Sequence, residues 1–271
     1  MKRICILIRV YDRIEDLQNN LSIIRNTWLS HNYDIIVVGN GKADGYILPE
    51  SINSLANNVI ELEYNAGHLK GNSQLLLEGL ANITLSNYDY VIILESDTWL
   101  YTDAIINKYV FLLDESDAVW ASARWYDRFY SLATDFALIK STFLKDNVNI
   151  FNFTIYPECY VCNYLMDRGL KYILINENMN VMVPSYIKTY PYAPKGRFYV
   201  FPKSKMVTHH IEDIKGGMNE KKYYFNVVAG RDFFKVNKTV SSIEKFKISI
   251  AFIFDKFLLR RSWYSKRRRC I

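Results

Sequence analysis

The chain has 271 residues, half of them hydrophobic, which suits one large α/β domain with a sizeable core. Its formal net charge of +6 arises from six basic residues, with no acid, between 260 and 271, so we expect no nucleic-acid partner. No stretch reaches the roughly 18–20 consecutive apolar residues of a membrane span, which argues against an integral membrane protein.

Apolar runs and helical periodicity alternate along the first hundred residues. Short runs rich in β-branched residues predict buried strands over 4–10, 34–39, 59–64 and 90–94. Apolar residues spaced three and four apart predict helices from Asp12 to Trp28 and over 69–80. Because strands that alternate with helices form right-handed βαβ units, we expect a mostly parallel sheet flanked by helices.

The middle of the chain is less regular. It predicts a helix over 157–169 and strands over 118–124, 134–139, 171–175 and 205–207. Residues 184–208 hold four of the six prolines and are expected to be rich in loops. The pair Gly216-Gly217 indicates a polar loop that can close over a bound nucleotide.

Residues 243–271 differ from the rest because apolar residues mix there with lysine and arginine. We therefore predict one domain over 1–242, with a nucleotide-binding half (1–100) and an acceptor half (101–242), followed by an amphipathic helical tail. Such a tail suits an anionic membrane surface, which predicts a cytoplasmic protein held at the inner face of the membrane. The alternative is a helix docked on the core with a disordered basic end. Cys159 and Cys162 form a CxxC motif without a second pair, which argues against structural zinc. The four cysteines do not indicate a disulfide scaffold, which fits a reducing cytoplasm.

Polar residues follow each of the first four predicted strands. In a parallel sheet, ligands bind beyond the carboxyl ends of the strands, so these residues should meet at one edge. The four groups are Tyr11-Asp12-Arg13, Asn40-Gly41, Asn65-Ala66-Gly67 and Glu95-Ser96-Asp97. Together they indicate a ligand site more strongly than any one of them.

The acidic pair Glu95 and Asp97 follows the most hydrophobic of these strands. Two carboxylates two residues apart, in a turn that leaves a sheet, can reach one cation and a diphosphate bound to it. Hard divalent ions prefer such oxygen ligands. The alternative interpretation is a solvated acidic turn.

The first hundred residues resemble GT-A glycosyltransferases, in particular the family 2-type enzymes that include cellulose- and chitin-synthase-like proteins and bacterial polysaccharide enzymes. The order and spacing of four motifs carry the resemblance. The counterparts here are Arg9-Val10-Tyr11-Asp12-Arg13, Gly39-Asn40-Gly41-Lys42, Asn65-Ala66-Gly67 with Lys70-Gly71-Asn72, and Glu95-Ser96-Asp97 for the DXD motif.

The resemblance implies a Rossmann-like GT-A fold, a nucleoside diphosphate sugar donor, and Mn²⁺ or Mg²⁺ as cofactor. It assigns nucleotide binding to Val10, Tyr11, Arg13, Asn40, Asn65, Gly67, Lys70, Glu95 and Ser96. Two residues depart from the pattern. Asn40 replaces the acid that usually contacts the base, so a UDP-sugar is only the default donor. Glu95 replaces an Asp, so Asp97 is the stronger metal-ligand candidate, and Glu95 can act through water or on the ribose.

Two adjacent histidines, His209 and His210, follow a predicted strand. A late histidine often completes the metal site in the resembling enzymes, and neutral imidazole ligates well beside carboxylates. Because neighbours in a strand point to opposite faces, only one of the two should reach the metal. Both stay candidates, and a surface or core histidine is the alternative.

Glu158 opens the helix predicted over 157–169 and resembles the carboxylate that faces the acceptor hydroxyl in the family. It is our candidate for the catalytic base, with Asp97 as the second catalytic residue. An acid in the first turn also stabilises a helix without any catalytic role. The usual following Asp is Cys159 here, and the rival carboxylates are Glu115, Asp117, Asp127 and Asp135.

We therefore expect an enzyme that transfers a sugar to a glycan or lipid-linked acceptor in cell-surface polysaccharide synthesis; an inverting outcome is implied by the resemblance. One alternative is a nucleotidyltransferase that makes sugar nucleotides, although the glycine-rich loop after the first strand is missing. Another is a non-catalytic, glycan-binding relative, because a fold does not fix a function.

Overall fold

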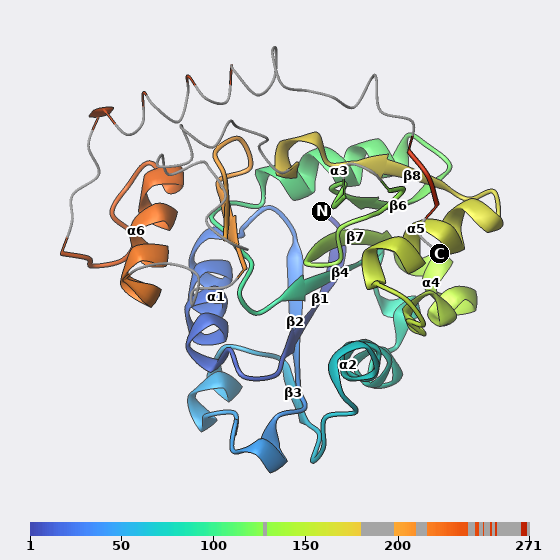
Figure 1. The fold of residues 1–271 in the computed structure, drawn as a ribbon, viewed down its shortest axis with the longest axis horizontal. Helices are drawn as coiled ribbons and strands as arrows, with labels where there is room; N and C mark the ends of the chain where they lie inside the picture. Colours follow the sequence, from blue (N-terminus) through green and yellow to red (C-terminus); the bar gives the residue numbers. More distant parts are fainter. Residues whose placement is uncertain are drawn as a thin grey trace.

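One seven-stranded sheet forms the centre of the part of the chain that the structure describes (Figure 1). This computed structural model describes residues 1–126, 129–179, 198–209, 216–237 and 267–269, and five single positions between 242 and 253. The strands of the sheet are β1 (Arg3–Val10), β2 (Asn32–Gly39), β3 (Asn58–Glu61), β4 (Tyr90–Glu95), β6 (Ala118–Ser122), β7 (Phe136–Lys140) and β8 (Lys171–Leu174). Their order is β3-β2-β1-β4-β7-β6-β8, and only β7 runs antiparallel to its neighbours.

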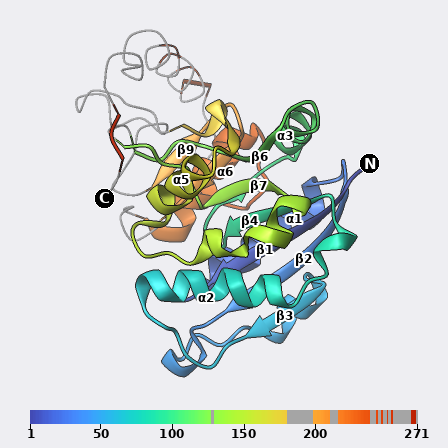
Figure 2. The same ribbon diagram turned by 90° about the vertical axis from the view of Figure 1, so that its right-hand side faces the viewer.

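Helices cover both faces of this sheet, as Figures 1 and 2 show. On one face lie α1 (Ile14–Thr27) and α3 (Ala104–Asp114); on the other lie α2 (His68–Ala81), α4 (Ser141–Asn147) and α5 (Pro157–Asp167). In β1, Ile6 packs into the first core and Leu7 into the second, because successive strand side chains point to opposite faces. An unbroken apolar run is therefore the pattern this central strand requires.

A second, three-stranded sheet brings a late segment of the chain back to the end of β4. Its strands are β5 (Trp99–Leu100), β10 (Met206–Thr208) and β9 (Tyr199–Phe201), in that order and all antiparallel. Helix α6 (Gly217–Ala229) packs on this sheet and beside α1 (Figure 1). Short 3₁₀ helices occupy the connections at Lys42–Asp44, Glu50–Ser54, Leu85–Asn87, Val148–Phe151 and Asn176–Asn178.

The sheet confirms the fold class predicted from the sequence, with several corrections to single elements. The predicted strand over 59–64 ends at Glu61, and the stretch expected to be rich in loops contains β9, which was not predicted. The strand predicted over 205–207 corresponds to β10. Of the pair Gly216-Gly217, predicted to lie in a polar loop, Gly216 forms a left-handed turn and Gly217 begins α6, so the prediction is wrong for Gly217; residues 210–215 lie outside the described part. Helices α3 and α4 were not predicted.

The predicted tail lies almost entirely outside the described residues. Its described end contacts the core, because Tyr130 N donates to Arg268 O at 3.1 Å and Arg269 pairs with Asp167 of α5 at 2.5 Å. Among the helices that the structure describes, none combines the length and the apolar character needed to cross a bilayer.

Candidate functional site

The four polar strand ends predicted from the sequence meet around one cavity of about 790 Å³. It lies at the carboxyl edge of β1, β2 and β4, as expected for a parallel sheet. Eleven candidate residues line it: Val10, Tyr11, Arg13, Asn40, Asn65, Gly67, Glu95, Ser96, Asp97, Glu158 and His209. Lys70 is exposed on α2 and does not line it, and His210 lies outside the described residues.

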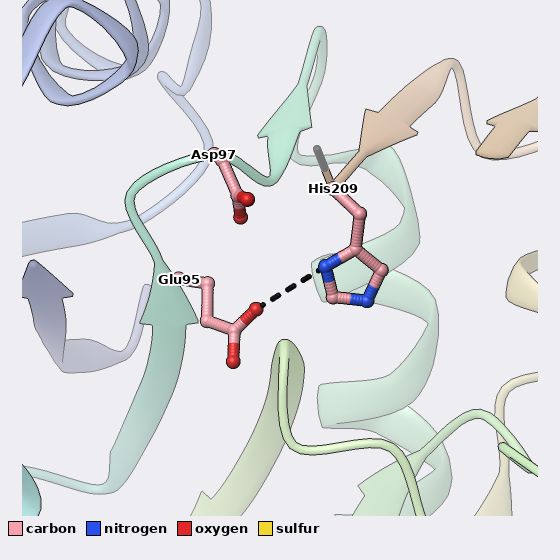
Figure 3. A group of neighbouring side chains, drawn as sticks. All are labelled: Glu95, Asp97 and His209. Atoms are coloured by element: carbon pink, nitrogen blue, oxygen red, sulfur yellow. Dashed lines mark ion pairs between the residues drawn. The ribbon is translucent and has the colours of Figure 1, made fainter. Parts of the chain in front are cut away.

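Three of these residues form a group that can hold a metal ion. Glu95 ends β4, Asp97 follows two residues later, and His209 follows β10 directly. Their ligand atoms lie within 4.8 Å of one another, and Figure 3 shows the three side chains pointing toward a common space. The sequence separates His209 from the acidic pair by more than a hundred residues, and the pairing of β10 with β5 brings them together.

The backbone of His209 is left-handed, with a φ of 73°. Non-glycine residues seldom adopt this conformation, which costs about 1–2 kcal/mol, and such strain often marks functional sites. His209 therefore does not follow the strand alternation that was expected of it. Its imidazole lies 4.8 Å from the Trp125 ring, between ring centroids, and its Nδ1 lies 3.5 Å from Glu95 Oε2.

The Glu95 carboxylate contacts both His209 of the metal group and a buried arginine, Arg9. Arg9 is 4% exposed, and its Nη2 donates to Glu95 Oε1 and to Thr134 O, both at 2.6 Å. One Glu95 oxygen is thus engaged by the guanidinium while the other faces His209. Sequence reasoning did not assign Arg9 a role, although a charged residue inside an apolar strand was the available signal.

A buried hydrogen-bond chain supports the metal group from behind. Thr208 donates to Asp135 Oδ2 at 3.1 Å and shares a bond of 2.5 Å with Thr98, which joins the ends of β10 and β5. Burial raises the pKa of Asp135 to about 6, with His209 opposing the shift. Since Asp135 lies under the site and not on the cavity wall, the structure favours a supporting place for it over that of a base.

Glu158 lies in the first turn of α5 and lines the same cavity. Burial raises its pKa to about 7; its own backbone N–H opposes the shift, while the nearby Glu95 and Asp135 charges add to it. A carboxyl with a pKa near neutrality is suited to taking up a proton.

The rival carboxylates lie elsewhere. Glu115 and Asp117 are exposed just before β6, whose start lies at the opposite edge of the sheet from the cavity. Asp117 pairs with Lys171 there at 3.1 Å. Asp127 lies outside the described residues. Among the carboxylates suggested as bases and described here, Glu158 is thus the one on the cavity wall.

Besides Tyr11, four aromatic side chains line the cavity together with Glu158 and His209, namely Trp125, Tyr126, Tyr156 and Tyr199. They contact one another edge to face, with centroids 5.8 Å apart for Trp125 and Tyr199 and 6.4 Å apart for Tyr126 and Tyr156. Aromatic rings with polar edges suit flat or ring-shaped ligands. Sequence reasoning noted the abundance of tyrosine but could not place these rings.

Asparagines and a glycine shape the far side of the cavity. Asn40 is fully buried, and its Nδ2 donates to Gly71 O and Gln74 Oε1, both at 3.2 Å. A Cβ at Gly71 would lie 2.0 Å from Asn65 Oδ1, which accepts from Gly67 N, so any larger residue at this position would displace the Asn65 side chain. In the described part of the chain, Oδ1 of Asn40 has no hydrogen-bond partner. This wall therefore retains an acceptor that its own fold does not satisfy.

No known protein family and no curated protein matches the sequence. The fold is similar to that of the mannosyltransferase PcManGT from Pyrobaculum calidifontis, solved in complex with GDP-Man and Mn²⁺. The TM-score is 0.51, at 12% identity, over 95% of this chain and 70% of that chain. A second solved structure, S. aureus TarS 1–349 in complex with UDP-GlcNAc, gives a TM-score of 0.38 at 16% identity, over 54% of this chain and 47% of that chain. At 12% identity, the first likeness is one of fold.

Proposed function

We propose that the protein is a metal-dependent glycosyltransferase, which moves a sugar from a nucleoside diphosphate donor to a glycan or lipid-linked acceptor in cell-surface polysaccharide synthesis. The observation that carries this proposal is the group of Glu95, Asp97 and His209 at the carboxyl edge of the sheet. The cavity around it, about 790 Å³, falls within the usual range of small-molecule sites. The likeness of fold to a mannosyltransferase supports the proposed glycosyltransferase activity.

The donor set of this group fits Mn²⁺ or Mg²⁺. Carboxylate oxygens suit both ions, and an imidazole favours the transition metal. Asp97 and His209 would be the main protein ligands, because Arg9 already engages one oxygen of Glu95. Once bound, the ion would neutralise charge on the departing diphosphate.

The nucleotide would lie against the wall formed by Tyr11, Asn40 and Asn65, with Val10, Arg13, Gly67 and Ser96 beside it. The buried Asn40 Oδ1 offers a neutral acceptor where related enzymes are expected to have a carboxylate. UDP stays the default nucleotide. GDP is the second choice to test, because the mannosyltransferase of similar fold was solved with GDP-Man.

The acceptor would enter beside Glu158 and the aromatic rings. Glu158 would take the proton of the acceptor hydroxyl. At the same time the oxygen of that hydroxyl would form the new bond to the anomeric carbon of the sugar, and the bond from that carbon to the diphosphate would break. The pKa near 7 leaves Glu158 partly ionised at neutral pH and able to accept that proton. Attack from the face opposite the diphosphate would invert the anomeric centre.

A thermal-shift panel tests the donor site directly. We expect Mn²⁺ together with one nucleoside diphosphate, UDP or GDP, to raise Tm by roughly 5–10 °C at 100 times Kd, and less with either alone. Absence of any nucleotide-dependent shift in the folded protein would favour the non-catalytic, glycan-binding alternative. Release of pyrophosphate from a nucleoside triphosphate and a sugar phosphate would favour the nucleotidyltransferase.

We further propose that residues 243–271 hold the protein at the inner face of an anionic membrane. The support is the cluster of six basic residues without an acid between 260 and 271. The full chain should sediment with phosphatidylglycerol vesicles at low salt, remain in solution with phosphatidylcholine vesicles, and detach as salt rises. Equal sedimentation with both vesicles, or with neither, would contradict the proposal.

A further inference from the structure

Lys221 of α6 is a fully buried lysine that contacts the metal group from behind. Its Nζ donates to Asp16 Oδ1 at 2.5 Å, to Asp97 O at 2.6 Å and to His209 O at 3.4 Å. An ammonium has three donors, and all three are used here. The same nitrogen lies 4.5 Å from the centre of the Trp99 ring.

We propose that Lys221 is a positioning residue, which fixes the spacing of the metal group by holding the backbone carbonyls of both Asp97 and His209. This inference rests on the metal site proposed above. The two carbonyls belong to segments more than a hundred residues apart, so the chain itself does not set their separation. The pairing of β10 with β5 brings the two segments together, and one buried nitrogen bonded to both carbonyls links them directly.

The stability of the fold does not require a charged side chain at position 221. Around it, α6 contributes Tyr223, Phe225 and Val227 to an apolar cluster that includes Trp99. Replacing a buried ion pair such as Asp16–Lys221 by well-packed hydrophobic residues of similar volume is often neutral or stabilising. What an apolar side chain could not supply is the pair of directed bonds to Asp97 and His209.

The hydrogen bond from Lys221 to the His209 carbonyl holds His209 in its strained, left-handed conformation. Its left-handed backbone aims the carbonyl toward α6 while the imidazole faces Glu95. Without a donor at this carbonyl, the residue is free to return to an extended conformation and carry its ring away from the acidic pair. Partners that orient metal ligands typically affect metal affinity by 10- to 100-fold.

The test replaces the ion pair by neutral residues, so that the net charge near the metal stays the same. We compare wild type with Asp16→Asn/Lys221→Met, which removes the donors, and with Asp16→Asn/Lys221→Gln, which restores an amide donor. The matched control is Glu15→Gln/Lys222→Met, since Glu15 and Lys222 pair at 3.1 Å on the exposed side of the same two helices. Mn²⁺ binding is measured from the free-ion EPR signal, with Mn²⁺ alone and with saturating UDP or GDP.

We expect the Met variant to bind Mn²⁺ 10- to 100-fold more weakly than wild type, the Gln variant to recover most of that loss, and the control to match wild type. A folded Met variant that binds Mn²⁺ within threefold of wild type would overturn the positioning role alone. If wild type binds no Mn²⁺ under any of these conditions, the proposed metal site fails as well. Should the Met variant not fold, Asp16→Leu/Lys221→Met provides the same comparison with an apolar filling.

Discussion

Asp97→Asn is expected to lower kcat by about 10³-fold while the protein remains folded. A bound cation contributes several kcal/mol of transition-state stabilisation, and each 1.4 kcal/mol is a factor of ten in rate. Asn keeps the shape of the side chain but removes the charge that would hold the ion. The loss should appear in steady-state turnover of the nucleotide sugar identified by the thermal-shift panel.

The stability of this variant separates a lost ligand from a damaged fold. Asp97 is 5% exposed, and its charge acts unfavourably on Asp16, whose pKa burial raises to about 6. Neutralising Asp97 relieves that repulsion, so Tm without metal should be equal to or higher than that of wild type. Asp146→Asn, at an exposed position of α4, is the control and should keep wild-type turnover. Turnover within tenfold of wild type, still dependent on Mn²⁺, would show that Asp97 is not a ligand.

Glu158→Gln is expected to lower kcat by about 10²- to 10⁴-fold, the usual contribution of a general base. Because the pKa of Glu158 is raised to about 7, the wild-type rate should rise with pH through 7 and level off above 8. The Gln side chain cannot accept the proton, so the residual rate should lack this rise. The pH profile of kcat for the two proteins is the measurement.

The same substitution has a predicted effect on stability. The folded-state pKa lies above the ordinary value of 4.5, so the folded protein holds this proton more tightly than the unfolded chain. The stabilisation this provides is complete below pH 4.5 and is lost as pH rises toward 7. Above pH 8, Glu158→Gln should therefore be more stable than wild type by about 1–3 kcal/mol in urea unfolding.

Glu78→Gln, an exposed position on α2, is the control for both readouts and should change neither. A Gln variant that keeps both the rate and its rise with pH would exclude Glu158 as the base. A Gln variant that lost stability at every pH would instead assign Glu158 to the fold, as the acid in the first turn of α5.

The central strands and the edge that carries the site followed from local pattern. The apolar runs of β1 and β4 have the length and composition of strands buried on both faces, and their alternation with helices fixed a parallel arrangement. Parallel strands place their carboxyl ends together, which is why Tyr11, Asn40, Asn65 and Glu95 could be assigned to one edge. Helix α3 was equally accessible, since Ile105, Ile106, Tyr109, Val110 and Leu113 form its buried side.

Only the tertiary structure determined which residues distant in sequence contact the site residues. Arg9 meets Glu95 only because β1 and β4 are neighbours, and His209 reaches the acidic pair only because β10 pairs with β5. The pKa of Glu158 depends on burial, which no sequence pattern states. In the sequence alone, Lys221 looks like an ordinary helix lysine beside Lys222. Local periodicity fixes which residues lie on a face or at an edge, but contacts distant in sequence arise only when the faces pack.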